Sequence, residues 1–286
     1  MTFTYIFLFL LILSTLTEIY LSIRQNASAL KNQNVVPSDF KKIVKPKDHK
    51  KAALYTSAKA KINILGFIVQ GVFLYLLTLG GLINYINELA LQFFDNEILQ
   101  GVVLIFSVII LSSIIDAPLG LIKTFVIDEK FGFNKMTLSL YLSDLVKQSL
   151  VSIIIMLPVI FIALWIFGNL GDYWWFWLWI FLSIFNVTML AIYPLYIAPI
   201  FNKFKPMEDK KLKAKIEQLL KKCGFESDGL FVMNGSLRST HGNAYFTGFG
   251  KAKRIVFFDT LLEKLSPNEI LAVLAHELGH FAHNHV

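Results

Sequence analysis

The stretch His276-Glu277-Leu278-Gly279-His280 lies near the end of this 286-residue sequence and decides how its last part folds. Just upstream, Ser266-Pro267-Asn268-Glu269 matches a capping box with proline at the first helical position, so a helix is expected to begin there. Four residues advance a helix by about 400°, which places His276 and His280 on one face, one turn apart. Two imidazoles at this spacing can bind one zinc ion, and Glu277 beside them can take a proton from an attacking water molecule.

The composition indicates a membrane protein. Hydrophobic residues make up 55% of the sequence and charged residues only 16%, whereas soluble domains carry about a quarter charged residues. The formal net charge is +7, which basic residues at the membrane edges explain, so no nucleic-acid partner is expected. The single cysteine, Cys223, excludes an internal disulfide and a cysteine zinc cluster within this sequence.

Five apolar segments are each long enough to cross a bilayer, which takes about 20 residues of helix. The third is interrupted at Asp116-Ala117-Pro118, and Asp116 faces either a bundle interior or the headgroups at the end of a shorter span. The fifth opens with four tryptophans, typical of an interfacial aromatic belt. The predicted spans are residues 3–23, 62–83, 99–122, 150–167 and 173–197.

The basic residues predict the topology. Of the 27 Lys and Arg residues, ten lie in 24–61, four in 123–147 and thirteen after Pro199. None lies in the two short loops at 84–98 and 168–172. Because basic loops stay in the cytoplasm, we expect a multi-pass protein with its N-terminus outside and His276 to His280 on the cytosolic side. The membrane is either the bacterial cytoplasmic membrane or that of the endoplasmic reticulum.

After residue 198 the composition becomes that of a soluble domain. The predicted fold is therefore mainly α, with a membrane domain over 1–198 and a small α+β zinc-peptidase domain over 199–286. Its expected elements are a helix at 208–223, strands at 229–233, 243–249 and 254–258, and the helix that carries the zinc motif.

A catalytic zinc site needs three protein ligands and one open position. His283 is seven residues from His276, a rise of about 10.5 Å, which is too far for one ion. His285 is turned about 140° from His280, and His241 precedes the 243–249 strand and could approach the site. The third ligand is therefore expected beyond Val286, and the sequence as given is expected to lack a complete zinc site.

Four blocks in this order resemble the integral-membrane CAAX prenyl protease family, the type I gluzincin-like zinc enzymes. The likeness spans nearly the whole sequence, and the order and spacing of the blocks are more specific than the zinc motif alone. The blocks are 125–135 (FVIDEKFGFNK), 200–204 (IFNKF), 243–250 (NAYFTGFG) continuing into Arg254-Ile255-Val256, and 276–280 (HELGH) followed by Asn284-His285.

The resemblance implies seven spans around a large chamber, with the zinc site at its cytosolic side and a later glutamate as third ligand. Five spans are present here. The strand that begins Asn243-Ala244-Tyr245 also resembles the substrate-binding edge strand of thermolysin-like peptidases. An edge strand offers unpaired N–H and C=O groups to an extended peptide. The alternative is that these residues form an ordinary hairpin strand.

The first hypothesis for function is a zinc endopeptidase embedded in the lipid bilayer. The resemblance implies a peptide or protein substrate, prenylated in a eukaryote and membrane-associated in a bacterium. A second hypothesis is a stress-type membrane quality-control zinc peptidase, although that group has fewer spans before the motif. A third is a catalytically inactive membrane scaffold or binding protein, which the missing third ligand favours. Taken alone, the H-E-x-x-H pattern could also arise by chance on a surface helix.

Overall fold

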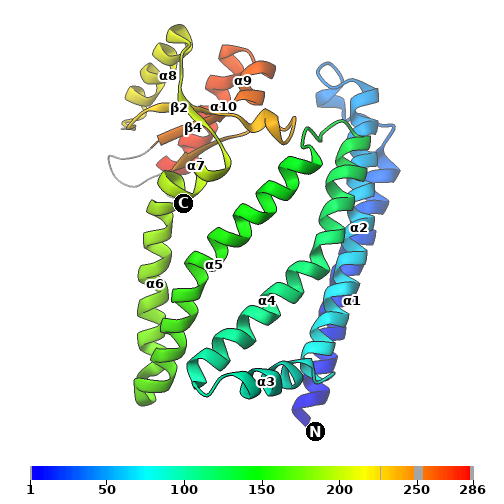
Figure 1. Ribbon diagram of the computed structural model, residues 1–286. Helices are drawn as coiled ribbons and strands as arrows, with labels where there is room; N and C mark the ends of the chain where they lie inside the picture. The colour runs from blue at the N-terminus through cyan, green and yellow to red at the C-terminus, as the bar shows by residue number, and fades with distance from the viewer. Residues whose placement is uncertain (1, 226, 248–253, 284–286) are drawn as a thin grey trace. The chain divides into compact units, whose positions relative to one another are not determined.

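Long apolar helices account for most of the chain. The computed structural model describes residues 2–225, 227–247 and 254–283 (Figure 1). Within these residues, five helical segments are long and apolar enough to cross a membrane, which confirms the expected fold class. They are α1 (Thr2–Asn32), α2 (Pro46–Thr78), α4 (Glu97–Leu121) with the π-helical η2 (Ile122–Asp128), α5 (Leu138–Asn169), and η3 (Gly171–Tyr173) with α6 (Trp174–Ile192), the π-helical η4 (Tyr193–Ile197) and α7 (Ala198–Phe201).

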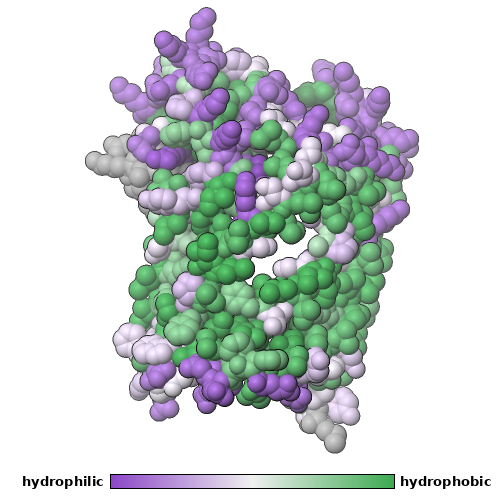
Figure 2. Space-filling view, viewed as in Figure 1, coloured by the Kyte–Doolittle hydropathy of each residue, from purple (hydrophilic) through white to green (hydrophobic). Residues whose placement is uncertain are grey.

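The outward side chains of these helices are apolar, as contact with lipid requires. Phe3 on α1 is 80% exposed and Ile154 on α5 is 71% exposed. Figure 2 shows hydrophobic residues along the long helices and hydrophilic residues gathered near their ends. Soluble monomers rarely expose so much apolar surface, so these side chains are expected to face the bilayer.

The chain forms two compact units, residues 1–132 and residues 133–286. The first holds α1 to α4, the short η1 (Ser38–Phe40) and η2, and the second holds everything from α5 onward. The expected boundary after residue 198 falls inside the second unit, because α5 and α6 group with the sheet that follows them. The boundary between membrane and soluble domains stays a prediction.

In the first unit, α1 and α2 pack closely through small residues. A Cβ atom added to Gly71 would lie 3.0 Å from the Thr15 hydroxyl oxygen, so the two backbones approach where glycine stands. Ser22, Ser57 and Ala60 are buried along the two helices. Small residues serve membrane helices in this way because lipid gives helix association no hydrophobic driving force.

The second span ends earlier than its sequence pattern predicts. Helix α2 stops at Thr78, and Gly81 follows with a φ of 78°, a left-handed conformation that favours glycine. Residues 84–98, expected as a polar loop, begin instead within a further helix, α3 (Leu82–Phe93). Its residues Ile86 and Ala90 are buried at a spacing of four, so one apolar face packs while Glu88 remains exposed.

Helix α4 runs through the predicted interruption at Asp116-Ala117-Pro118. Pro118 stands inside the helix, which is tolerated in membrane helices because neighbouring groups satisfy the freed carbonyl. The Asp116 carboxylate accepts a hydrogen bond of 3.3 Å from Gln70 Nε2 on α2. Both residues line a hollow of about 370 Å³, so Asp116 faces a neighbouring span.

The second unit carries a four-stranded sheet in the order β1-β2-β4-β3. Strands β2 and β4 are parallel, while the β1–β2 and β3–β4 pairs are antiparallel. Three of the strands were expected; the short β1 contains Pro206, which masks its pattern. The bounds are β1 (Phe204–Pro206), β2 (Leu230–Met233), β3 (Ala244–Thr247) and β4 (Arg254–Phe258), and residues 248 and 249 of the expected third strand lie outside the described residues.

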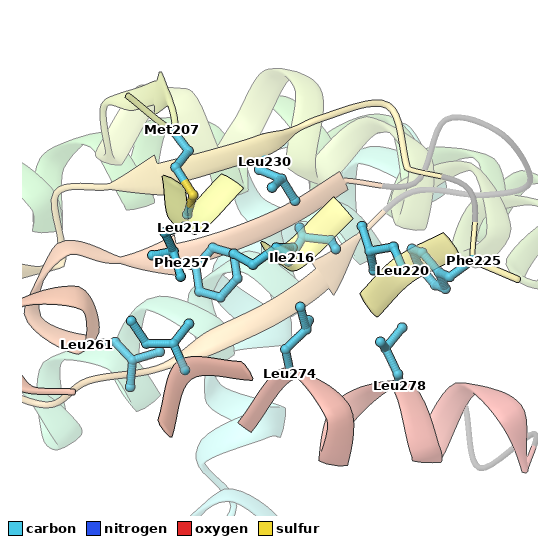
Figure 3. Packing of buried hydrophobic residues seen from close by; sticks show 12 residues of the cluster. Met207, Leu212, Ile216, Leu220, Phe225, Leu230, Phe257, Leu261, Leu274 and Leu278 are labelled. Carbon is cyan, nitrogen blue, oxygen red and sulfur yellow. The ribbon is translucent and has the colours of Figure 1, made fainter. Parts of the chain in front are cut away.

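Helices α8 (Lys210–Lys222), α9 (Asp259–Lys264) and α10 (Pro267–Ala282) enclose the core with this sheet. Helix α8 begins two residues after the expected Glu208, because the Asp209 side chain caps it by accepting the Lys211 and Leu212 N–H groups at 2.9 and 3.0 Å. In Figure 3, Leu274 and Leu278 of α10 point toward the sheet, and Phe257 of β4 is fully buried. The core comprises Met207, Leu212, Ile216, Leu220, Phe225, Leu230, Ile255, Phe257, Leu261, Ile270, Leu274 and Leu278.

Candidate metal centre and substrate strand

The start of α10 is fixed by the predicted capping box. Glu269 Oε2 accepts hydrogen bonds of 2.7 Å from both the backbone N–H and the hydroxyl of Ser266. The Ile270 N–H in turn donates to the Ser266 carbonyl at 3.0 Å. The two bonds from Ser266 hold the pKa of Glu269 below its ordinary value. The expected helix from Pro267 is confirmed.

The two faces of α10 meet different surroundings. Ile270, Leu274 and Leu278 follow one another at a spacing of four, and each is at most 2% exposed. His276 stands two residues beyond Leu274, about 200° around the helix, and His280 follows on the same side. His276 is exposed, while Glu277 and His280 are half-buried. The core therefore holds one face of the helix rigidly and leaves the histidines on the other.

The two imidazoles converge. Nε2 of His280 lies 3.2 Å from Nε2 of His276, with the ring centroids 4.8 Å apart and the ring planes at 84°. Nitrogen atoms at this distance either share a hydrogen bond or bind one cation. A tetrahedral zinc ion with Zn–N bonds of about 2.0–2.1 Å holds its ligand nitrogens about 3.3 Å apart. The arrangement of these rings therefore fits such an ion.

A third ligand is not brought to this pair within residues 2–225, 227–247 and 254–283, where no group of three His, Cys, Asp or Glu side chains could hold a metal. His241 instead stacks on Phe133, with ring centroids 4.5 Å apart. The His283 N–H bonds to the Gly279 carbonyl at 3.0 Å and so extends the helical turn. His285 lies outside the described residues.

Strand β3 ends the described sheet and pairs with β4 along one edge. The Phe258 N–H donates to the Asn243 carbonyl at 2.9 Å, and the register continues as Ala244 opposite Phe257. In an antiparallel pair, the inward-bonded residues alternate with outward-pointing ones. The backbone groups of Ala244 and Phe246 therefore point outward. Asn243 Oδ1 accepts a hydrogen bond of 2.9 Å from the Ala244 N–H.

The side chains of β3 divide between two faces of the sheet. Ala244 and Phe246 pack against the core that α8 and α10 share, and Phe246 lies 5.1 Å from Phe225 between ring centroids. Tyr245 points to the opposite face and meets Phe258 edge-on at 6.3 Å. Burial raises the pKa of the Tyr245 hydroxyl, and the nearby Tyr193 raises it further.

Sequence reasoning did not single out Arg238, which lies between β2 and β3. Its guanidinium donates to Asp144 on α5, to the Asn202 side chain and to the Phe201 carbonyl. Asp144 could have drawn attention, because it is an acid in the early turns of a long apolar helix. Its partner is 94 residues away in the sequence, and no local pattern connects the two.

Five membrane-spanning helices followed by a small mixed sheet and a capped H-E-x-x-H helix define a class of multi-span membrane proteins with a peptidase-like domain. Residues 25–203 match the family model described as "CAAX prenyl protease N-terminal, five membrane helices". Residues 206–286 match the model of peptidase family M48. The chain belongs to the CAAX prenyl protease family and, with it, to peptidase family M48, and it is a multi-pass membrane protein.

Similar proteins come from plants, fungi and animals. The chain is 38% identical over 283 residues to the CAAX prenyl protease 1 homolog of rice (Oryza sativa subsp. japonica), covering 96% of this chain and 66% of that protein. It is 45% identical over 178 residues to CAAX prenyl protease 1 of Saccharomyces cerevisiae, covering 62% of this chain and 39% of the yeast protein. The chain thus spans about two thirds or less of the length of these relatives.

The fold is also found among solved structures. The crystal structure of S. mikatae Ste24p aligns with a TM-score of 0.89 at 34% sequence identity. The alignment covers 96% of this chain and 66% of that one. The chain therefore shares the fold of that protein.

Proposed function

We propose that this chain is part of a membrane-embedded zinc metalloendopeptidase that cleaves prenylated CAAX peptides at the cytosolic side of the membrane. The observation that carries the proposal is the pair of imidazole nitrogens 3.2 Å apart on α10. They lie on the face of the helix opposite the buried leucines. The sheet that packs against α10 ends in strand β3, and a peptide can pair with the outer edge of this strand.

His276 and His280 hold the metal in this proposal, and the third ligand comes from outside the described residues. The imidazole pair suits zinc, which favours nitrogen ligands and tetrahedral geometry. When bound, zinc supplies Lewis acidity that polarises the scissile carbonyl and acidifies the attacking water.

Glu277 is the proposed general base. It follows His276 directly on α10 and is half-buried. It takes a proton from the attacking water and afterwards gives that proton to the leaving amine. The helix cap and the buried leucines keep this side chain in place during both transfers.

Strand β3 is the proposed substrate-binding strand. A peptide that adds to its outer edge pairs with the backbone groups of Ala244 and Phe246. The Asn243 side chain, which now bonds to the Ala244 N–H, turns to the peptide backbone and frees that donor. Tyr245 contributes from the sheet face that lies opposite the core.

The substrate class follows from the family and the membrane setting. The similar proteins from rice and yeast are named CAAX prenyl proteases, and prenyl groups keep their carriers at a bilayer surface. The basic loops predict that the zinc motif lies on the cytosolic side. A lipid-anchored peptide that meets the β3 edge there is the substrate that fits these features.

The test uses the full-length protein in lipid nanodiscs with a fluorogenic prenylated peptide. Glu277→Gln should lower kcat by about 10²- to 10⁴-fold, the usual contribution of a general base, while the zinc content measured by mass spectrometry stays that of the wild type. Glu263→Gln, an exposed glutamate on α9, is the matched control and should keep full activity. Undiminished cleavage by Glu277→Gln would overturn the mechanism.

Removal of the metal is a second measurement. A chelator should abolish cleavage by the wild-type protein, and added zinc should restore it. His276→Ala should lose both the bound zinc and the activity, and zinc should not rescue it. A protein that cleaves the peptide equally well in chelator is no metallopeptidase.

A further inference from the structure

The side chain of Arg238 bonds to three separate segments of the second unit. Nε donates to Asp144 Oδ2 at 2.7 Å and Nη2 to Asp144 Oδ1 at 2.9 Å, which makes a bidentate pair. Nη1 donates to Asn202 Oδ1 at 2.9 Å, and Nη2 also donates to the Phe201 carbonyl at 2.7 Å. The Arg238 and Asp144 side chains are 22% and 15% exposed. Such a partly buried, bidentate pair is geometrically specific in a way that a lysine cannot reproduce.

The partners of Arg238 belong to the ends of two membrane helices. Asp144 lies on α5, six residues before Leu150, or about 9 Å of helix from the predicted apolar span. Phe201 ends α7, the last turn of the helical stretch that begins at η3, and its carbonyl is one that the helix leaves unpaired. Arg238 therefore joins the α5–α6 hairpin at its sheet-side end.

The backbone next to Arg238 is tied to the segment that leads into α5. The Lys135 N–H donates to the Arg238 carbonyl, and the Thr240 N–H donates to the Phe133 carbonyl, both at 3.1 Å. Phe133 also stacks on His241. The loop that begins α5 and the loop that begins β3 thus form one paired structure.

The loop that begins β3 is also held closely against helix α9. The Thr260 hydroxyl donates to the His241 carbonyl at 2.8 Å, and Lys264 Nζ donates to the Thr240 carbonyl. A Cβ atom at Gly242 would lie 3.0 to 3.1 Å from side-chain and backbone atoms of Leu261, so the loop packs closely on α9. Asn243, where the edge strand begins, follows directly.

We infer that Arg238 is a positioning residue that fixes the β3 edge to span α5, and so sets the distance between the membrane surface and the bond that is cleaved. The inference rests on the proposed function. Through this link the enzyme selects peptides whose scissile bond lies a set number of residues from a lipid-anchored residue. A water-soluble peptide does not need this distance, because it can approach β3 from solution.

The test compares two peptides of identical sequence, one prenylated and held in vesicles with the full-length protein, the other without lipid. Arg238→Gln should lower kcat/KM for the prenylated peptide by about tenfold or more, since small misplacements of reacting groups have large effects on rate. For the soluble peptide the change should stay within about twofold, the scatter of a remote substitution. Zinc content should not change.

Arg254→Gln is the matched control. Arg254, on β4, also pairs with an aspartate, Asp228. The distance between Nε and Oδ2 is 3.5 Å, and the Asp228 side chain is 54% exposed. Arg254→Gln should leave the ratio of the two kcat/KM values unchanged. Arg238→Lys keeps the charge without the bidentate geometry and should restore the ratio only in part. An equal loss for both peptides in Arg238→Gln would assign Arg238 a purely structural role and overturn the inference.

Two further measurements cover a variant that does not fold. Asp144→Asn keeps the shape of the side chain and should shift the ratio in the same direction. In the wild-type protein, glycines inserted between the prenylated residue and the scissile bond should reduce cleavage steeply with each residue. If the wild-type protein cleaves these peptides equally well at every spacing, the inference is overturned. If the wild-type protein cleaves neither the prenylated nor the soluble peptide, the proposed function itself is overturned.

Discussion

At the scale of single residues, Leu274 and His276 stand two positions apart on α10 and have opposite surroundings. Leu274 is 1% exposed, whereas His276 is exposed. The helix thus uses one face for packing and carries the proposed metal ligands on the other. Because the packing face fixes the backbone, it also fixes the direction of both imidazoles. We therefore expect stability and the proposed metal binding to be coupled through the same helix.

Leu274→Ala should destabilise the second unit by about 2–5 kcal/mol, because it removes buried methyl groups and leaves a cavity. The measurement is chemical unfolding of the full-length protein in detergent. The control is Leu237→Ala, since Leu237 is 49% exposed and its truncation opens no cavity. Equal shifts for the two variants would contradict the assigned core.

Asn243→Ala should lower kcat/KM about fivefold, because one hydrogen bond to the substrate backbone has a net value of about 1 kcal/mol. Initial rates on the prenylated peptide provide the measurement, and zinc content should stay constant. Asn268→Ala, an exposed asparagine on α10, should have no effect. Wild-type kinetics in Asn243→Ala would leave β3 an ordinary hairpin strand.

At the scale of elements, α10 depends on the cap at its N-terminus. Glu269 bonds to both the backbone and the hydroxyl of Ser266, and these bonds lower its pKa. A carboxyl group with a lowered folded-state pKa stabilises the fold at pH values above its unfolded-state pKa. That stabilisation is lost as the pH falls through the folded-state pKa.

Glu269→Gln should therefore lower the thermal midpoint at neutral pH, and the difference from wild type should shrink as the pH falls below the ordinary glutamate pKa of 4.5. A pH series of thermal unfolding curves in detergent measures this. Glu263→Gln on α9 should show a smaller difference at every pH. A Glu269→Gln difference that does not change with pH would rule out the charged cap.

Two helix boundaries differ from what the apolar runs in the sequence predict. The apolar run of residues 62–83 continues past the end of α2, because Leu82 and Ile83 belong to α3. Hydropathy counts these residues with the span, but the left-handed Gly81 breaks the helix between them. The reverse occurs at Pro118, where a residue that normally ends a helix stands within α4.

At the scale of the whole molecule, the basic residues and the spans together predict the orientation. Cys223 provides a direct test, because it is the single cysteine of this sequence and is exposed at the end of α8. In sealed vesicles with the cytosolic face outward, a membrane-impermeant maleimide should label Cys223. In vesicles of the opposite orientation, Cys223 should be protected.

The complementary site is Asp172 in η3, between α5 and α6. Asp172→Cys in a Cys223→Ser background should give the reverse labelling pattern. The Cys223→Ser protein alone is the control, and any labelling of it comes from another thiol. Labelling of both positions from the same side would refute the predicted topology.

Much of this protein could be predicted from local patterns. Apolar runs of about 20 residues indicate membrane spans whatever surrounds them, because an unpaired backbone is too unfavourable in lipid. The capping box and the H-E-x-x-H spacing predict a helix with two histidines on one face, since helical geometry is local. The run of β-branched and aromatic residues from Arg254 to Phe258 likewise predicts a strand.

Only the tertiary structure decided the rest, because it depends on contacts between distant residues. It placed β3 at the end of the sheet, and thereby determined which backbone groups point outward. It also joined Arg238 to Asp144 across 94 residues of sequence. The periodicity of the sequence predicts the side of its own helix or strand on which a side chain lies. The partner that this side chain meets is determined by how the helices and strands pack.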